Sequence, residues 1–204
     1  MLNPLRSADA QQAQMRWNDR YQQSTSSPQP CRVLQDNQHL LPSSGKALDL
    51  ACGLGGNAYL LATKGLETWA WDISDVAISQ VRQTAQQRGL TIHTEVRDAV
   101  SDPPAPASFD VIVVSRFLDR QLRAALIAAL KTDGCLYYQT FIKQAPDDIG
   151  PKEDRFRLDS QELLNMFRSL RTLVYREEAQ VGDLTRGWRN EALLVGQKGT
   201  EHYG

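Results

Sequence analysis

The chain has 204 residues, 41% of them hydrophobic and 23% charged, which is typical of one domain with one sizeable core. Its 23 Lys and Arg residues against 24 Asp and Glu residues give a formal net charge of -1, so no overall positive charge attracts a nucleic-acid backbone. No apolar run approaches the roughly 20 residues of a membrane span, and we expect a soluble protein with neither nucleic acid nor membrane as a partner.

Cellular location and metal content are predicted from the N-terminus and the cysteines. The first residues, MLNPLRSADAQQAQMRW, lack the apolar centre and the small-residue cleavage site of a signal peptide. Cys31, Cys52 and Cys135 are far apart, form no CxxC pair and have no histidine at metal-ligand spacing. We therefore predict a cytoplasmic protein with reduced thiols and no metal, while the sequence carries no signal for its oligomeric state.

Strand and helix patterns alternate along most of the chain. A helix is expected over about residues 5–21, and the run STSSPQP ends it. Beyond Lys46, strands are predicted in ALDL, ETWAWDIS, TIHTEV, DVIVVS and GCLYYQTF. Helices are predicted in NAYLLATKG, in SDVAISQVRQTAQQRG with Ser74 as its N-cap, and in LDRQLRAALIAAL. This alternation indicates a right-handed, doubly wound α/β sheet.

The C-terminal part begins with a polar segment, IKQAPDDIGPKEDRF, that is too long for a minimal connection, and we predict a lid or substrate loop there. A helix is expected at about 159–168, followed by strands near 170–177 and 190–196. The loop between these two strands has no helix for a parallel crossover, so the last strand is expected to pair antiparallel. The whole pattern predicts a mostly parallel, seven-stranded, Rossmann-like sheet with helices on both faces.

A glycine turn follows the first predicted strand. Gly53 and Gly55 allow the backbone to turn tightly and to approach a ligand, although both also suit an ordinary tight turn. Asp72 ends the second predicted strand, where an acid suits hydrogen bonding to ribose hydroxyls. Because dinucleotides and S-adenosylmethionine both contain a ribose, this pair of features does not distinguish them.

Asp49, four residues before Gly53, provides a distinction through its charge. A pyrophosphate over the turn would be repelled by this carboxylate, whereas the sulfonium and α-ammonium of S-adenosylmethionine would be attracted. The charge therefore favours S-adenosylmethionine. The alternative is that Asp49 is a turn acid that caps the amides of the following helix.

A family resemblance is carried by motifs along nearly the whole chain. ALDLACGLGG, WDIS, VRDAV, FDVIVVSRFLDR and DGCLYYQTF resemble the successive motifs of class I S-adenosylmethionine-dependent methyltransferases. RWNDRY, DRFRLDSQELLNMF and LRTLVYREE are similar to segments of the small tellurite-resistance (TehB-like) group. The sequence departs from that pattern at Ala51, where members have Gly, and on the substrate side at Asp119 and Asp159, where relatives often carry His and Arg.

The resemblance implies S-adenosylmethionine as cofactor and S-adenosylhomocysteine as product. It implies methionine contacts around Asp49 and the glycines, ribose contacts from Asp72, and adenine contacts from Ile73 and Asp98. Ser115 would lie beside the transferring methyl group. We further expect that Arg20 and Tyr21, with Trp17, close over the methionine carboxylate, although Trp17 also suits plain helix packing. The predicted cofactor-binding residues are Arg20, Tyr21, Asp49, Ala51, Gly53, Gly55, Asp72, Ile73, Asp98, Ala99 and Ser115.

The domain organisation expected from this resemblance is a single methyltransferase domain over residues 1–204. It comprises an N-terminal helix and cap (1–45), a cofactor-binding core (46–142), and a lid loop, helix and strand pair (143–204).

The acceptor is expected to be a small molecule. Methyl transfer from a sulfonium is an in-line displacement that needs alignment more than a protein nucleophile, so no residue is assigned as catalytic. Ser115-Arg116-Phe117-Leu118 follows the fourth strand in place of the Asn/Asp-Pro-Pro-aromatic motif of enzymes that methylate base amines. The acceptor-side candidates are Ser115, Arg116, Arg120, Arg155 and Arg157. An arginine cluster suits an anionic acceptor, and a chalcogen-containing one fits the resemblance, but the same arginines also suit surface pairs with Asp119, Asp154 and Asp159.

Three other functions are compatible with parts of the pattern. A sensor that binds S-adenosylmethionine without turnover is not excluded by the sequence. An NAD-dependent oxidoreductase is disfavoured by the charge of Asp49 and by the lack of a Tyr-x-x-x-Lys pair. A lesser variant is an enzyme that transfers an aminopropyl group from decarboxylated S-adenosylmethionine instead of a methyl group.

Overall fold

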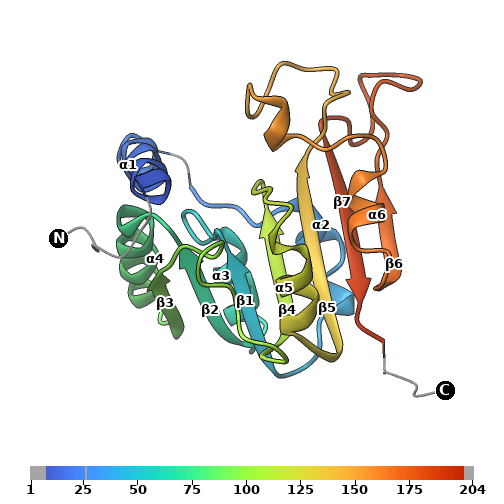
Figure 1. Cartoon of the computed structure of the whole chain (residues 1–204). Helices are drawn as coiled ribbons and strands as arrows, with labels where there is room; N and C mark the ends of the chain where they lie inside the picture. The colour runs from blue at the N-terminus through green and yellow to red at the C-terminus, as the bar shows by residue number, and fades with distance from the viewer. Residues whose placement is uncertain (1–7, 26, 200–204) are drawn as a thin grey trace.

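A computed structural model describes residues 8–25 and 27–199. One seven-stranded sheet runs through the molecule, with helices packed on it (Figure 1). The helices are α1 (Ala8–Gln22), α2 (Arg32–Asp36), α3 (Gly56–Thr63), α4 (Asp75–Gln87), α5 (Leu122–Ala129) and α6 (Glu162–Met166), with 3-10 turns η1 (Gln38–Leu40) and η2 (Asp154–Phe156). The strands are β1 (Lys46–Leu50), β2 (Glu67–Asp72), β3 (Ile92–Val96), β4 (Phe109–Ser115), β5 (Leu130–Phe141), β6 (Arg171–Arg176) and β7 (Glu191–Gln197).

The sheet order is β3-β2-β1-β4-β5-β7-β6. The pairs among β1 to β5 are parallel, whereas β7 lies antiparallel to both β5 and β6. The predicted fold class, including the antiparallel last strand, is therefore confirmed. The strand order reverses between β1 and β4, and ligands of doubly wound sheets bind at the carboxyl ends of the strands beside such a reversal.

The hydrophobic core lies on both faces of the sheet, which explains the continuous apolar run of β4. Val111 and Val113 pack on the face covered by α2 and α3, while Ile112 and Val114 pack on the face covered by α5 and α6. Helix α4 begins as predicted, since the Ser74 hydroxyl accepts a hydrogen bond from the Ala77 amide at 3.1 Å.

Several elements differ from the prediction. Helix α2 and turn η1 were not predicted, because the three to five residues in each are too few to show a helical period. Helix α5 begins only at Leu122, after the Asp119 carboxylate has accepted a hydrogen bond from the Gln121 amide and closed a turn. Strand β5 begins at Leu130, directly after α5, and so is longer than the predicted strand.

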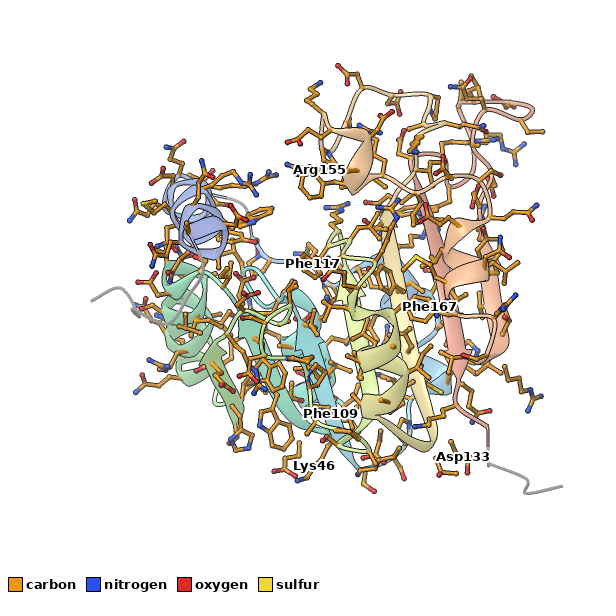
Figure 2. All side chains as sticks on the ribbon, viewed as in Figure 1. Lys46, Phe109, Phe117, Asp133, Arg155 and Phe167 are labelled. Carbon is orange, nitrogen blue, oxygen red and sulfur yellow. The ribbon has the colours of Figure 1, made fainter. Side chains whose placement is uncertain are left out.

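The segment 142–156 and the β6–β7 loop lie together at one end of the sheet (Figure 1). The side chain of Gln180 donates to the carbonyl of Ala145 at 3.2 Å, and that of Asn190 donates to Asp147 at 2.8 Å. Figure 2 places Arg155 and Phe117 at this end of the sheet and Lys46, Phe109 and Asp133 at the other. The described ranges, 8–25 and 27–199, include no helix that is long and apolar enough to cross a membrane.

Candidate functional site

The glycine turn connects β1 to α3 at the carboxyl end of the sheet. Gly53 and Gly55 have φ angles of 52° and 81°, in the left-handed region that favours glycine. The Cys52 amide donates to the Trp71 carbonyl at 2.9 Å, which ties the turn to the neighbouring strand β2. The turn therefore lies beside the end of β2, in the position where a ligand of this fold class binds.

Asp72 fixes the same turn from the end of β2. One carboxylate oxygen accepts a hydrogen bond from the Gly53 amide at 2.8 Å, and the other accepts from the Ser74 amide at 2.9 Å. Burial raises the pKa of Asp72, while these amide bonds oppose the shift. Each carboxylate oxygen has a second lone pair, so Asp72 retains acceptor capacity for a ligand's hydroxyl groups.

Asp49 is fully buried and points at the start of α3. Its carboxylate accepts hydrogen bonds from the Asn57 side chain at 3.1 Å and from the Ala58 amide at 3.0 Å. Burial raises its pKa to about 7, although both hydrogen bonds favour the charged form. This is the helix-capping arrangement that the sequence left open. The sequence argument for a cationic cofactor assumed that the Asp49 carboxylate faces the ligand. Because Asp49 caps α3 instead, that argument no longer holds.

Helix α1 packs on α4 beside the glycine turn (Figure 1). Asn18 donates to the Asp75 carboxylate at 2.7 Å and accepts from the Ser74 hydroxyl at 2.6 Å. The capping residue of α4 thus holds α1 in place. Gln80 of α4 also donates to the Tyr21 carbonyl at 3.3 Å, near the last turn of α1.

Three aromatic and basic side chains of α1 lie together. Trp17 and Tyr21 stack with their ring centroids 5.6 Å apart, and the Arg20 guanidinium lies 5.2 Å from the Trp17 ring. The Tyr21 hydroxyl lies against Gly53, and burial raises the pKa of Tyr21. Of the predicted trio, Tyr21 contacts the glycine turn, and Trp17 and Arg20 stack behind it on α1.

The other predicted cofactor residues follow the carboxyl ends of β1, β2 and β3. Asp98 is half-buried and accepts from the Val100 amide at 3.1 Å and from the Ser101 hydroxyl at 2.7 Å. Ala99 is buried, while Ile73 is half-buried after β2. Ala51 has a φ of 55°, a left-handed conformation that strains alanine. Glycine, which family members have at this position, adopts it without strain.

Two of the predicted acceptor-side arginines are engaged in structural contacts. Arg120 forms two hydrogen bonds with the Glu162 carboxylate, at 2.6 and 2.9 Å, and donates to the carbonyls of Arg155 and Arg157. Arg157 is buried and donates to three carbonyls, those of Ile142, Ile149 and Pro151. The buried Arg157 guanidinium therefore holds segment 142–156, and the exposed Arg120 guanidinium ties Glu162 to the backbone at 155 and 157.

The other two arginines are more exposed. Arg155 has a side chain that is 69% exposed and forms an ion pair with Glu153 at 2.7 Å. Arg116 follows the half-buried Ser115 at the end of β4, and its Nε donates to the Glu191 carboxylate at 2.7 Å. Sequence reasoning missed Glu191, since a single acid within an apolar C-terminal strand gives no motif.

Comparison with known proteins gives consistent results. Residues 47–134 match a family model described as a methyltransferase domain. The probable S-adenosyl-L-methionine-dependent methyltransferase TehB of Haemophilus influenzae is 28% identical over 138 residues, which cover 65% of this chain and 48% of TehB. Over these residues the chain is similar to S-adenosylmethionine-dependent methyltransferases of the TehB type. It spans about half the length of the curated relatives that it matches.

Solved structures share the fold of this chain. The crystal structure of Haemophilus influenzae TehB superimposes with a TM-score of 0.67 at 20% identity, covering 89% of this chain and 67% of TehB. A protein solved in work on conversion of a disulfide bond into a thioacetal group during echinomycin biosynthesis gives 0.69 at 20% identity, covering 94% of each chain. At such identities the likeness shows the fold alone.

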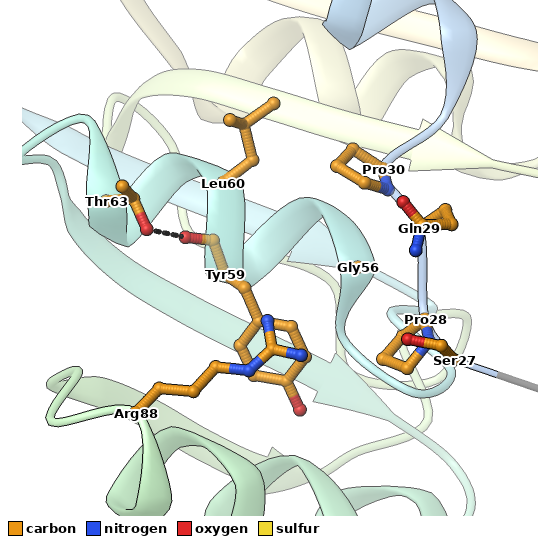
Figure 3. Close-up of a pocket in the computed structure, with 9 residues that line it drawn as sticks. All are labelled: Ser27, Pro28, Gln29, Pro30, Gly56, Tyr59, Leu60, Thr63 and Arg88. Carbon is orange, nitrogen blue, oxygen red and sulfur yellow. Dashed lines mark hydrogen bonds between the residues drawn. The ribbon is translucent and has the colours of Figure 1, made fainter.

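A separate groove of about 230 Å³ lies beside α3, between residues 27–30 and Arg88 (Figure 3). The Arg88 guanidinium lies 4.5 Å from the Tyr59 ring, and the Thr63 hydroxyl donates to the Tyr59 carbonyl at 2.8 Å. None of the predicted cofactor or acceptor residues lines this groove. In the described part of the chain, no group of three or more His, Cys, Asp and Glu residues is placed to hold a metal ion.

Proposed function

We propose that this chain binds S-adenosylmethionine across the carboxyl ends of β1, β2 and β4 and catalyses transfer of its methyl group to a small molecule. The observation that carries the proposal is the Asp72 carboxylate bonded to the Gly53 amide, because it places an acid with spare acceptor capacity against the glycine turn at the carboxyl end of the sheet. The methyltransferase-domain match over the same residues supports this choice of cofactor.

The residues present fit the cofactor chemically. The positive φ angles of Gly53 and Gly55 leave the turn backbone uncovered by side chains of its own, which allows close approach of the methionine part. Asp72 accepts from the ribose hydroxyls, and Ile73, Asp98 and Ala99 surround the adenine. Trp17, Arg20 and Tyr21 close the methionine end from α1, and the Arg20 guanidinium offers a partner for its carboxylate.

The cofactor supplies an already activated methyl group. The sulfur–methyl bond breaks as the bond from the methyl carbon to the acceptor nucleophile forms, and S-adenosylhomocysteine leaves. The chain's residues therefore align the nucleophile with the methyl group and exclude water, which contributes up to roughly 7–11 kcal/mol in ideal cases. Ser115, at the end of β4, borders the transferring methyl group in this arrangement.

The acceptor is proposed to be a small anionic or chalcogen-containing molecule that the protein methylates in the cytoplasm. The exposed guanidinium of Arg116 supports an anionic acceptor, as does Arg155, which lies at the same end of the sheet as Phe117, the residue after Arg116 (Figure 2). The resemblance to the tellurite-resistance group supports a chalcogen-containing one. We also propose that residues 1–204 act as one domain.

Titration calorimetry with S-adenosylmethionine, S-adenosylhomocysteine and NAD tests this proposal. We expect micromolar binding of the first two compounds and at least tenfold weaker binding by Asp72→Asn, which loses one acceptor oxygen. Asp19→Asn, on the exposed side of α1, is the matched control. Binding of NAD alone would overturn the cofactor assignment. If the cofactor binds but no acceptor yields S-adenosylhomocysteine, the chain is a sensor instead.

A further inference from the structure

The four predicted acceptor-side arginines differ in how many of their N–H donors are used. Arg120 and Arg157 each donate to at least three acceptors, most of them backbone carbonyls. Arg155 pairs through Nε with Glu153, a neighbour on its own exposed segment. Arg116 also uses only Nε, and within the described ranges its two Nη nitrogens have no hydrogen-bond partner. Arg116, however, is held by a buried partner.

A chain of hydrogen bonds from the backbone of α2 fixes Arg116. The Val33 amide donates to the Oε1 atom of Gln139 at 2.8 Å, which orients the Gln139 side-chain amide. The Nε2 atom of Gln139 then donates to Oε2 of Glu191. The other carboxylate oxygen, Oε1, accepts from Arg116 Nε at 2.7 Å. Each group in the chain thus determines the orientation of the next.

The burial of Gln139 and Glu191 strengthens their hold on Arg116. Gln139 is 1% exposed and Glu191 is 3% exposed, whereas the Arg116 side chain is 62% exposed. A buried carboxylate without a cationic partner is strongly unfavourable, so Glu191 retains the Arg116 guanidinium at the protein surface. Neither Nη group has a hydrogen-bond partner among residues 8–25 and 27–199, so both remain available.

The backbone of Arg116 supports the same interpretation. Its φ of 55° is unusual for a residue other than glycine, and its amide donates to the Gln139 carbonyl at 2.8 Å. Its guanidinium carbon lies 5.7 Å from the Phe141 ring. Arg116 follows Ser115, the residue that borders the methyl group in the proposed function. A pre-oriented cation therefore lies next to the expected reaction centre.

We propose that Arg116 binds a carboxylate group on the methyl acceptor through its two Nη nitrogens, and that Glu191 and Gln139 are positioning residues for it. This inference rests on the proposed function, since it places the acceptor beside the cofactor. The planar pair of Nη donors matches the two oxygens of a carboxylate. The nucleophile is another atom of the same molecule, and it gains the methyl group while S-adenosylhomocysteine leaves.

Equilibrium binding to protein saturated with S-adenosylhomocysteine tests this inference without requiring turnover. The probes are acetate, 3-mercaptopropionate and benzoate, each compared with its carboxamide, titrated by NMR or calorimetry. We expect at least one carboxylate to bind about tenfold or more tightly than its amide. Arg116→Gln is expected to abolish this ratio, and Arg116→Lys to retain only part of it, because an ammonium cannot form the paired contact. Equal binding of carboxylates and amides in every pair would overturn the inference.

The positioning role of Glu191 requires a separate comparison. Glu191→Gln keeps the size of the side chain but weakens its hold on Arg116, and we expect a threefold to tenfold loss in the carboxylate-to-amide ratio. Adding Glu191→Gln to Arg116→Gln should cause no further loss of that ratio, even if the melting temperature falls. An equal loss in both backgrounds would mean that Glu191 does not act through Arg116. Arg123→Gln removes an exposed arginine of α5 and should change neither ratio nor melting temperature.

The two proposals fail in different ways. If S-adenosylhomocysteine does not bind, the proposed function is wrong, and the carboxylate titrations on the free protein then measure the Arg116 contact alone. If S-adenosylhomocysteine binds but Arg116→Gln leaves the carboxylate preference unchanged, the proposed function stands and the role given to Arg116 is wrong.

Discussion

The hydroxyl group of Tyr21 lies so close to Gly53 that a β-carbon added to this glycine would be 2.9 Å from the hydroxyl oxygen. The contact joins α1 to the glycine turn across 32 residues of sequence. It also means that Gly53 meets two requirements, a left-handed backbone with a φ of 52° and close approach of another side chain.

Gly53→Ala is therefore expected to weaken S-adenosylmethionine binding by more than tenfold and to lower stability by about 1–2 kcal/mol through backbone strain. Calorimetry and urea denaturation measure the two effects. Combining Gly53→Ala with Tyr21→Ala relieves the collision but not the strain, so the double variant should regain only part of the stability. Full recovery would mean that the steric contact alone requires glycine.

Ala51, two residues before Gly53, predicts the opposite result. Its φ of 55° strains an alanine, and glycine adopts this backbone conformation freely. We expect Ala51→Gly to raise the free energy of unfolding by about 0.5–1 kcal/mol, net of the extra entropy of the unfolded chain. Ala124→Gly, at an exposed position of α5, should instead lower it by about 1 kcal/mol. A loss of stability in both variants would contradict the interpretation of strain at Ala51.

Local signals in the sequence predicted most of the fold and the acid that bonds to the glycine turn. The buried strand β4, the N-cap at Ser74 and the acid at Asp72 each depend on residues within a few positions of one another, so their patterns are readable. The roles of Asp49 and Glu191 depend on partners brought together by folding. Asp49 needs the start of α3 to become a cap, and Glu191 needs Gln139, 52 residues away, to complete the hydrogen-bond chain that holds Arg116.

The roles of the four acceptor-side arginines also could not be predicted from local sequence. Arg116, Arg120, Arg155 and Arg157 look equivalent in the sequence, since all lie in polar segments after predicted strands. Only the tertiary structure separates the buried Arg157, bonded to three carbonyls, from the exposed Arg155. Their long side chains reach several possible partners, and the fold decides which one is within range.

This separation predicts different effects for two alanine substitutions. Arg157→Ala leaves three carbonyls without their charged donor, and we expect a loss of about 2–4 kcal/mol of stability and faster proteolysis within 142–156. Arg155→Ala should change stability by less than about 0.5 kcal/mol and raise the acceptor KM while leaving cofactor affinity intact. Chemical denaturation, limited proteolysis and steady-state kinetics distinguish the two residues. Similar stability losses in both variants would show that Arg155 is also a structural residue.

Asp49 predicts how stability depends on pH. Its pKa of about 7 in the folded chain lies above the usual value of 3.8, chiefly because burial disfavours the charge. Between about pH 4 and 7 the folded chain therefore retains a proton that the unfolded chain has lost. The contribution of this group is fully present below about pH 4, decreases as the pH rises through 7, and then stays level.

Asp49→Asn removes this titration. We expect the free energy of unfolding of the wild type to fall relative to that of the variant between pH 5 and 8, by an amount on the order of a few kcal/mol. The variant should still be less stable at pH 5, by about 1–3 kcal/mol, because its amide nitrogen must face the Asn57 or Ala58 donor. Asn57 cannot turn to compensate, since its own oxygen accepts from the Cys31 amide at 2.8 Å.

Urea denaturation at pH 5, 6, 7 and 8 gives the free energy of unfolding as a function of pH. Asp19→Asn, on the exposed side of α1, is the control and is expected to follow the wild type. Parallel profiles for wild type and Asp49→Asn would mean that Asp49 is charged throughout this range, held so by its two hydrogen bonds.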